Sequence, residues 1–354
     1  MTTISTELEL QRPQTPAGLL SRAEKDRLIE RGMVGIYRWY FDQSQSKRNW
    51  NPYRSFDWAN FRTDHSPDMI SILERFLAVE QYVPDYTSKL TQLTRRSLGR
   101  SHFQILWGAE EAKHAELWYN TLLFSKARSA KWIADFVHNL RQQEWKLPWD
   151  DALHMSCYVV IQERATQLNY LKTVQIAMGR SDKSAVANDQ DPVLAQAAQT
   201  IANDEAAHYG FFLSIASLYL YYYPAQLLTA LEDVIKNFAM PALDLFEDPN
   251  WGEVLYRTGI YGPREYTRDV LQAALKQLNI HSRKALEQGI RNSRQVPDPD
   301  GNLCDSAIFD AFDYHAVERN VKNTIERATR YAQEVGIANL DPILFTPSGL
   351  APTA

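Results

Sequence analysis

Two segments of the chain place a histidine three residues after a glutamate. Glu111-Ala112-Lys113-His114 and Glu205-Ala206-Ala207-His208 both read Glu-x-x-His. Residues three apart lie on the same face of an α-helix, so each segment could offer one carboxylate and one imidazole to the same metal ion. One such pair is a weak signal, since Asp135-x-x-His138 and Asp151-x-x-His154 show how easily similar spacings arise.

A lone glutamate inside an apolar run precedes each of these two segments. Glu80 lies 31 residues before Glu111, and Glu163 lies 42 residues before Glu205. Four helices would therefore carry, in order, Glu, Glu-x-x-His, Glu and Glu-x-x-His. This order is the ligand pattern of ferritin-like bundles that bind two iron or two manganese ions.

The charge of these residues supports a metal site. Four glutamates in a bundle core are costly to bury unless cations compensate them, and two divalent ions bring four positive charges. Carboxylate and imidazole ligands suit iron or manganese. Each glutamate alone could equally be a surface residue in a solvated ion pair, but the six residues in this order favour a metal site.

The cysteines point in the same direction. The chain has two, Cys157 and Cys304, and they form no Cys-x-x-Cys pair. This pattern argues against an iron–sulfur cluster and favours a reducing, cytoplasmic compartment.

The elements that must position these residues are helices. Glycine is sparse, with 14 residues in 354, and long stretches lack helix breakers. Ser66-Pro67-Asp68 is typical of a helix start, Pro84 predicts a kink, and Gly99-Arg100-Ser101 predicts a break before the next helix. The expected helices span residues 67–90, 102–125, 132–147, 152–178, 193–223, 227–238, 265–278 and 314–335, with a loop at 179–192 and a turn at 296–303.

Together these elements predict an all-α fold, a ferritin-like four-helix bundle with additional flanking helices. The apolar stretch 211–228 contains two serines, a glutamine and Pro224, so a buried helix is favoured over a transmembrane segment. The N-terminal residues show no signal-peptide pattern, and the net charge of −5 argues against non-specific binding of nucleic acid.

Several short strings of this chain resemble one known family. They are Trp50-Asn51-Pro52, Glu110-Glu111-Ala112-Lys113-His114, Gln162-Glu163-Arg164-Ala165-Thr166, Asp204-Glu205-Ala206-Ala207-His208 and Met240-Pro241-Ala242. In this order they are similar to the motifs of the soluble acyl-carrier-protein desaturases, the plastid stearoyl type and its bacterial relatives. The resemblance covers about residues 25–290 and implies a flexible tail at 1–20, a ferritin-like di-iron desaturase domain at 21–294 and a peripheral C-terminal segment at 295–354.

The resemblance also implies roles for individual residues. Glu111 and Glu205 would bridge two iron ions, and the full set of metal ligands would be Glu80, Glu111, His114, Glu163, Glu205 and His208. Trp50 and Asp204 would pass electrons inward, with His208 as the final step. Simple packing is the alternative for Trp50, and a hydrogen bond that orients His208 is the alternative for Asp204. Thr166 would lie near the oxygen-binding side and deliver protons.

The family further implies a reaction and partners. The reaction would be O2-dependent introduction of a cis double bond into a fatty acyl chain on acyl carrier protein, with ferredoxin as electron donor and a homodimer as the assembly. Acyl carrier protein is acidic, and two basic stretches could receive it: residues 89–100, with four Lys or Arg and no acid, and residues 263–294, with a net charge of +4. A solvated helix face is the alternative for either stretch.

The chain also departs from the plant members of the family. Val79 stands where they carry a threonine, and the segment after Gln295 does not follow their pattern. Acyl chain length, double-bond position and reaction outcome therefore stay open. Hydroxylation or N-oxygenation by the same centre is one alternative, a ferritin-like iron-storage protein is a second, and an inactive scaffold is a third.

Overall fold

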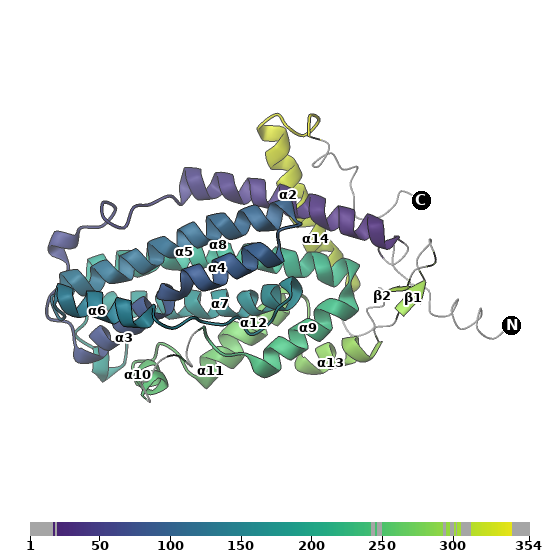
Figure 1. Cartoon of the computed structure of the whole chain (residues 1–354). Coiled ribbons are helices and arrows are strands. Elements are labelled where there is room, and N and C mark those ends of the chain that lie inside the picture. Colours follow the sequence, from purple (N-terminus) through teal and green to yellow (C-terminus); the bar gives the residue numbers. More distant parts are fainter. Residues whose placement is uncertain are drawn as a thin grey trace.

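The computed structural model describes most of the chain, and its helices are arranged as shown in Figure 1. The described residues are 17, 20–241, 245, 250–292, 295–297, 301, 303–305 and 313–341. The tail expected at residues 1–20 lies almost entirely outside this set, as do large parts of the segment 295–354.

The described residues are predominantly helical, which confirms the predicted all-α class. The helices are α2 (Arg22–Lys47), α3 (Pro67–Val79), α4 (Val83–Leu93), α5 (Leu98–Ser125), α6 (Ala130–Leu140), α7 (Ala152–Ala177), α8 (Pro192–Tyr222), α9 (Pro224–Asn237), α10 (Trp251–Arg257), α11 (Pro263–Glu265), α12 (Gln272–Gln277), α13 (Arg283–Asn292) and α14 (Tyr314–Glu334). Shorter helical segments are η2 (Trp58–Asn60), η3 (Glu80–Tyr82), η4 (Ser184–Val186) and the π-helical η6 (Tyr266–Leu271). Strands β1 (Gln295–Pro297) and β2 (Leu303–Asp305) pair antiparallel, with Val296 opposite Cys304, so the expected turn at 296–303 connects a small hairpin.

Long helices packed side by side form the centre of the fold (Figure 1). Helix α7 packs along α8, α5 contacts α3, α4 and α8, and α2 and α14 cover the side formed by α5 and α8. Side-chain caps fix the starts of the central helices: Ser66 accepts a hydrogen bond from the amide of Met69, and Asp151 and Asp191 cap α7 and α8 in the same way. These caps define where the central helices begin.

The start of α5 differs from the prediction. Helix α5 begins at Leu98, capped by Ser97, and runs through Gly99-Arg100-Ser101 without a break. The glycine has a packing role instead, because a Cβ atom built on Gly99 would lie 2.4 Å from the backbone carbonyl of Met33 in α2. Gly99 therefore lets two helices approach closely rather than ending one of them.

The N-terminal helix α2 was not predicted at all. A capping box of Ser21 and Glu24 starts it, and its buried residues include Ile29, Met33 and Ile36, at spacings of three and four. The remaining positions are mostly polar, which hides this narrow apolar stripe in the sequence. Helices α10 and α13 were also missed, and the helix expected at 265–278 is divided into α11, η6 and α12.

The kink expected at Pro84 and the apolar stretch 211–228 both lie within the described residues. A short 3-10 segment, η3, separates α3 from α4, so the interruption comes just before Pro84, which occupies the first turn of α4. The apolar stretch 211–228 covers the largely buried second half of α8, which ends at Tyr222, and the start of α9. Among the described residues, no helix combines the length and the apolar character that a membrane span requires.

Candidate metal centre

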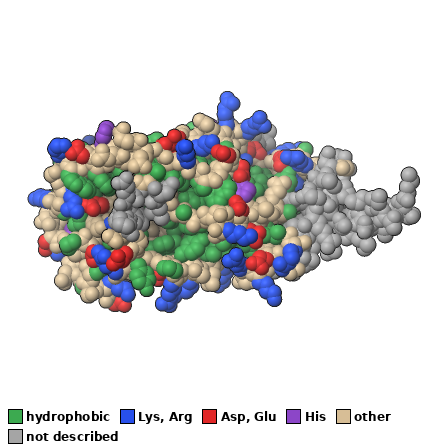
Figure 2. Space-filling model, turned by 60° about the horizontal axis from the view of Figure 1, so that its bottom comes forward, with side chains coloured by type: hydrophobic (Ala, Val, Ile, Leu, Met, Phe, Trp, Pro, Cys, Tyr) green, Lys and Arg blue, Asp and Glu red, His purple; other side chains and the backbone are tan. Residues whose placement is uncertain are grey.

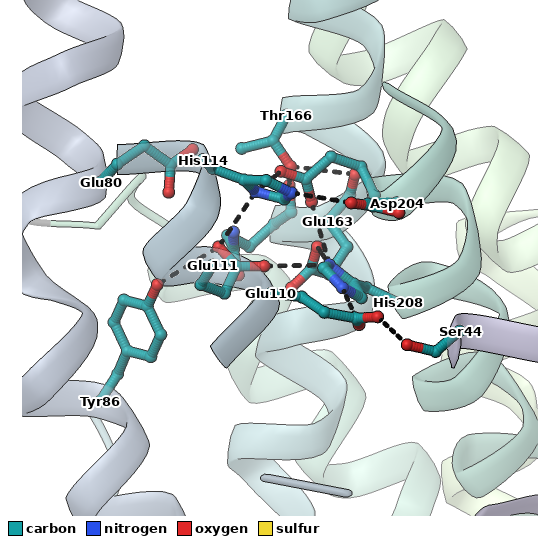
Figure 3. A network of polar contacts seen from close by, with 12 residues as sticks. Ser44, Glu80, Tyr86, Glu110, Glu111, His114, Glu163, Thr166, Asp204 and His208 are labelled. Carbon is teal, nitrogen blue, oxygen red and sulfur yellow. Dashed lines mark hydrogen bonds and ion pairs between the residues drawn. The ribbon is translucent and has the colours of Figure 1, made fainter. Parts of the chain in front are cut away.

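Four elements bring the six Glu and His residues together inside the bundle. Glu80 lies at the junction of α3 and η3, and Glu163 lies on α7. The Glu-x-x-His pairs lie on α5 and α8. All six side chains are buried, with 3% or less of each residue exposed. Figure 3 shows side chains from these elements converging on one point.

The six residues form two overlapping sets of possible ligands. Glu80, Glu111, His114 and Glu205 make one set, and Glu111, Glu163, Glu205 and His208 make the other. Within each set one ligand atom per residue lies within 4.8 Å of all the others. Glu111 and Glu205 belong to both sets. Each set could hold one cation, and Glu111 and Glu205 could contribute to both.

The atoms at the centre lack hydrogen-bond partners. His208 Nδ1 lies 2.9 Å from Glu111 Oε1 and 3.4 Å from Glu163 Oε2, and His114 Nδ1 lies 3.5 Å from Glu205 Oε1. Within the described part of the chain, none of these buried atoms has a hydrogen-bond partner in favourable geometry: Glu111 Oε1, His114 Nδ1, both carboxylate oxygens of Glu163, Glu205 Oε2 and His208 Nδ1. Unsatisfied buried groups are costly, so these converging lone pairs fit bound metal ions.

Burial and neighbouring charges shift the pKa values of the acids in this cluster. Burial raises the pKa of Glu163 well above its ordinary value, and neighbouring Glu205 raises it further. Burial and the charge of Glu111 likewise raise the pKa of Glu80. Burial opposes the charged form of Glu111 too, but the histidines outweigh it and lower the pKa of Glu111 to about 2. Metal ions would displace protons from such a cluster.

The Nε2 atom of each histidine contacts an acidic side chain of the neighbouring helix. His114 of α5 lies with Nε2 3.4 Å from Oδ2 of Asp204 in α8, whereas His208 of α8 lies with Nε2 3.0 Å from Oε2 of Glu110 in α5. The expected link from Asp204 to His208 was therefore wrong. Asp204 directly precedes Glu205, and one residue turns a helix by about 100°, so Asp204 faces α5 while Glu205 faces the centre.

One arginine at the end of α2 joins the two acids. Arg48 donates to Asp204 over 2.8 Å and lies 3.8 Å from Glu110. Its guanidinium also lies over the ring of Tyr40, whose hydroxyl donates to Glu110. Asp204 contacts His114, and Glu110 contacts His208. Both acids thus lie next to the same cation, the guanidinium of Arg48. Figure 3 shows Asp204 next to His114 and Glu110 next to His208.

Trp50 lies next to this network, as the sequence suggested. Its indole nitrogen donates to Asp204 over 2.7 Å. Its ring is parallel to that of His114, with an interplanar angle of 3° and a centroid distance of 6.1 Å. Trp50 is half-buried, so an unbroken contact path runs from the surface through Trp50 and Asp204 to His114.

Thr166 lies in the wall of a narrow cavity. Its hydroxyl donates to backbone carbonyls of α7, 3.2 Å from Gln162 O and 3.1 Å from Glu163 O. The cavity has a volume of about 20 Å³, and Glu80 and Glu111 reach its wall. The remaining lining is largely apolar and aromatic: Val79, Tyr86, Leu90, Trp107, Trp145, Met155, Tyr158, Val159, Gln162 and Pro241. This volume holds about one water-sized molecule.

Two tyrosines add hydrogen bonds that the sequence did not reveal. The hydroxyl of Tyr86 lies 3.2 Å from Glu111 Oε2, and the hydroxyl of Tyr170 donates to Glu80. Glu110 could have been found, because an acid precedes the ligand glutamate in both Glu-x-x-His segments. Arg48, Tyr86 and Tyr170 carry no comparable spacing signal.

The helical bundle and the buried Glu/His cluster together define a ferritin-like protein with a site able to hold metal. The family model for fatty acid desaturases matches residues 63–296. This match covers well over half of the chain, so the protein belongs to the fatty acid desaturase family, as the sequence motifs indicated.

Solved structures give a more distant likeness. One that matches is the X-ray structure of DesA2 from Mycobacterium tuberculosis H37Rv, provisionally assigned there as an acyl-ACP desaturase. It shares 14% sequence identity and a TM-score of 0.49, over 74% of this chain and 99% of the DesA2 chain. No curated protein matches the chain.

Proposed function

We propose that this protein is an O2-dependent desaturase that introduces a cis double bond into a fatty acyl chain carried on acyl carrier protein. The observation that carries the proposal is the pair of overlapping ligand sets that share Glu111 and Glu205, beside a narrow cavity with aromatic walls. Membership of the fatty acid desaturase family agrees with it.

Six side chains would hold the metal: Glu80, Glu111, His114, Glu163, Glu205 and His208. We propose two iron ions, with manganese as the second choice that this donor set suits. Two bound iron ions supply the activation of O2, which amino-acid side chains cannot achieve alone.

The side chains around the cluster would position the acyl chain and keep water away from it. The aromatic residues of the cavity exclude water from the reacting carbons, and Thr166 places a hydroxyl at its wall for proton transfer. Trp50, Asp204 and His114 give electrons from a reduced ferredoxin a short contact path inward. The cavity is narrow, so a long acyl chain requires its lining side chains to move as the chain enters.

Mass spectrometry of the product tests this function. The iron-loaded protein receives ferredoxin, its reductase, O2 and acyl carrier protein with a C16 or C18 chain. We expect a loss of two hydrogens that disappears in Glu163→Ala and persists in the control Glu144→Ala, which changes an exposed glutamate. A gain of one oxygen would identify a hydroxylase instead, and an unchanged acyl chain would refute these substrates.

The assembly gives a separate test against iron storage. We propose a homodimer, on the basis of the family resemblance alone. A dimer on a calibrated sizing column would support this proposal, whereas a large cage would favour storage.

A further inference from the structure

A second and larger cavity lies where the C-terminal end of α7 meets the turn after α10. Its volume is about 540 Å³, within the range of ligand pockets. It shares no lining residue with the cavity beside Glu80. The lining residues are Lys172, Gln175, Ile176, Arg180, Ser181, Asp182, Lys183, Tyr256, Arg257, Thr258, Gly259, Tyr261, Arg264 and Glu265.

The charge of this cavity is opposite to that of the whole chain. Five of the lining residues are Lys or Arg and two are acidic, which gives a net charge of +3 in a protein of net charge −5. Figure 2 views the molecule from the side of α10 and α11, where blue Lys and Arg side chains stand along the edges of the face. A concave site of one charge concentrates ligands of the opposite charge.

Three of these cations form no close ion pair. Arg257 pairs with Asp68, and Lys183 lies 4.0 Å from Asp182. In contrast, within the described part of the chain the side chains of Lys172, Arg180 and Arg264 form no hydrogen bond and no close ion pair, although the charge of Lys172 helps to lower the pKa of Asp269, which does not line the cavity. They are therefore free to bind an anion.

A buried hydroxyl in the cavity also lacks a partner. Tyr261 lines the cavity, and its hydroxyl oxygen is shielded from solvent without a hydrogen-bond partner among the described residues. A shielded hydroxyl of this kind costs free energy unless a ligand or water satisfies it. Tyr256 adds an aromatic ring at the rim, with 67% of the residue exposed.

The basic residues are not needed to cap the end of α7. Amides of the following residues already bond the carbonyls of its last turns, including Met178 N to Val174 O and Arg180 N to Gln175 O. The backbone also shapes the rim. Gly259 has a φ of +75°, and the aliphatic part of the Lys183 side chain lies 3.0 Å from the position that a Cβ atom on Gly259 would take. The shape of the cavity thus depends on the backbone turn at Gly259.

We propose that this cavity binds a ligand that carries a phosphate group. Lys172, Arg180 and Arg264 would neutralise the phosphate, and the hydroxyl of Tyr261 would donate to it. This inference does not rest on the desaturase function. Lys172 follows Glu163 by nine residues on α7, about 13.5 Å along the helix axis, so the ligand would lie outside the metal cluster. Free small molecules and the phosphopantetheine arm of a carrier protein both supply such a phosphate.

Calorimetric titration of the full chain with pyrophosphate tests the inference, in the absence of iron, O2 and turnover. We expect saturable binding that weakens at least about tenfold in the double variant Arg180→Gln/Arg264→Gln, since two charge-assisted contacts are lost. The control Arg330→Gln/Lys146→Gln removes the same charge from exposed positions and should keep the native affinity. Tyr261→Phe should also weaken binding.

Equal affinity in the cavity variant and the control, or no binding of pyrophosphate at all, would overturn the inference. Two further titrations identify the source of the phosphate. Once pyrophosphate binds, coenzyme A that binds with the same dependence on Arg180 and Arg264 points to a free ligand. Phosphopantetheinylated carrier protein that binds with this dependence when coenzyme A does not points to the carrier arm. Because the readout is binding alone, a failed desaturase assay leaves this result intact.

Discussion

At the scale of single residues, each histidine of the cluster is positioned by an acidic residue of the other helix. Asp204 of α8 holds His114, and Glu110 of α5 holds His208. Groups behind a metal-bound histidine fix the orientation of its ring and raise its basicity. Because Arg48 contacts both acids, it can influence both metal positions at once.

Replacement of Arg48 should therefore loosen both metal ions together. In Arg48→Gln we expect the affinity for both ions to fall by about 10–100-fold, the range typical of such supporting contacts, so a chelator should remove both ions faster than from the native protein. Asp204→Asn or Glu110→Gln should accelerate the loss of one ion more than the other. Stopped-flow release with a coloured chelator measures this, and Arg54→Gln, at an exposed position, is the control. Native release rates in Arg48→Gln would contradict a linking role.

The affinity for metal should fall as the pH falls. Burial raises the pKa of Glu80 and Glu163, so the metal-free cluster holds protons that must leave when metal binds. A group whose pKa is raised in this way is more fully protonated as the pH decreases, and those protons compete with metal binding. Competition with a chelator from about pH 8 to about pH 6 measures the effect. An affinity independent of pH would show that the ligands are already deprotonated.

Residue types and spacing predicted which six residues meet, but not how the cluster is supported. The Glu-x-x-His spacing works because it is local to one helix. The contact of Arg48 with Asp204 joins positions 156 apart in sequence, so only the packed fold reveals it. The same limit explains why Asp204 was linked to the wrong histidine: the sequence gives its helix but not the neighbour that it faces.

At the scale of elements, the bundle depends on a close approach of α5 to α2. Gly99 has no side chain at the point where the backbone of Met33 passes. The sequence suggested a helix break there, because glycine is a poor helix former and tertiary contacts cannot be seen. The failure to predict α2 has the same cause, since this helix is stabilised by a narrow buried stripe and not by overall hydropathy.

Two glycine replacements should have opposite effects on stability. A Cβ at Gly99 would clash with backbone, so Gly99→Ala should lower the free energy of unfolding by about 1–3 kcal/mol, as for an overpacked core. Gly210 lies within α8 with nothing within 4 Å of its would-be Cβ, so Gly210→Ala should raise it by about 0.5–1 kcal/mol. Denaturant unfolding of both variants measures the difference. A stable Gly99→Ala would show that α2 and α5 can separate at little cost.

At the scale of the whole molecule, the charged core and the charged surface serve different purposes. The core collects four glutamates and two histidines from four elements, so metal binding ties those elements together. The surface of this acidic chain includes a basic cavity that no sequence motif predicted. Its residues come from the end of α7 and the loop after it, from the end of α10 and the turn after it, and from α11, which the fold brings together. The bundle class was predictable from helical periodicity, whereas this junction of loops was not.

Removal of metal should destabilise the whole fold. A ligand that binds only the folded state at 100 times its dissociation constant adds about 2.7 kcal/mol of stability. We therefore expect the melting temperature of the iron-loaded protein to fall when a chelator removes the metal. Calorimetry measures the shift, and Glu163→Ala should show a smaller one because one ligand set is incomplete. Identical melting with and without metal would mean that the cluster is not coupled to folding.

The most direct test of the central claim is a count of the metal ions that the native chain binds. Ferrous iron is titrated without O2 into metal-free protein, and the bound iron is determined by mass spectrometry after gel filtration. Two overlapping ligand sets predict two iron ions per chain, and Glu163→Ala should retain at most one tightly. A native stoichiometry of one or zero, or a full two ions in Glu163→Ala with native affinity, would contradict the dinuclear centre.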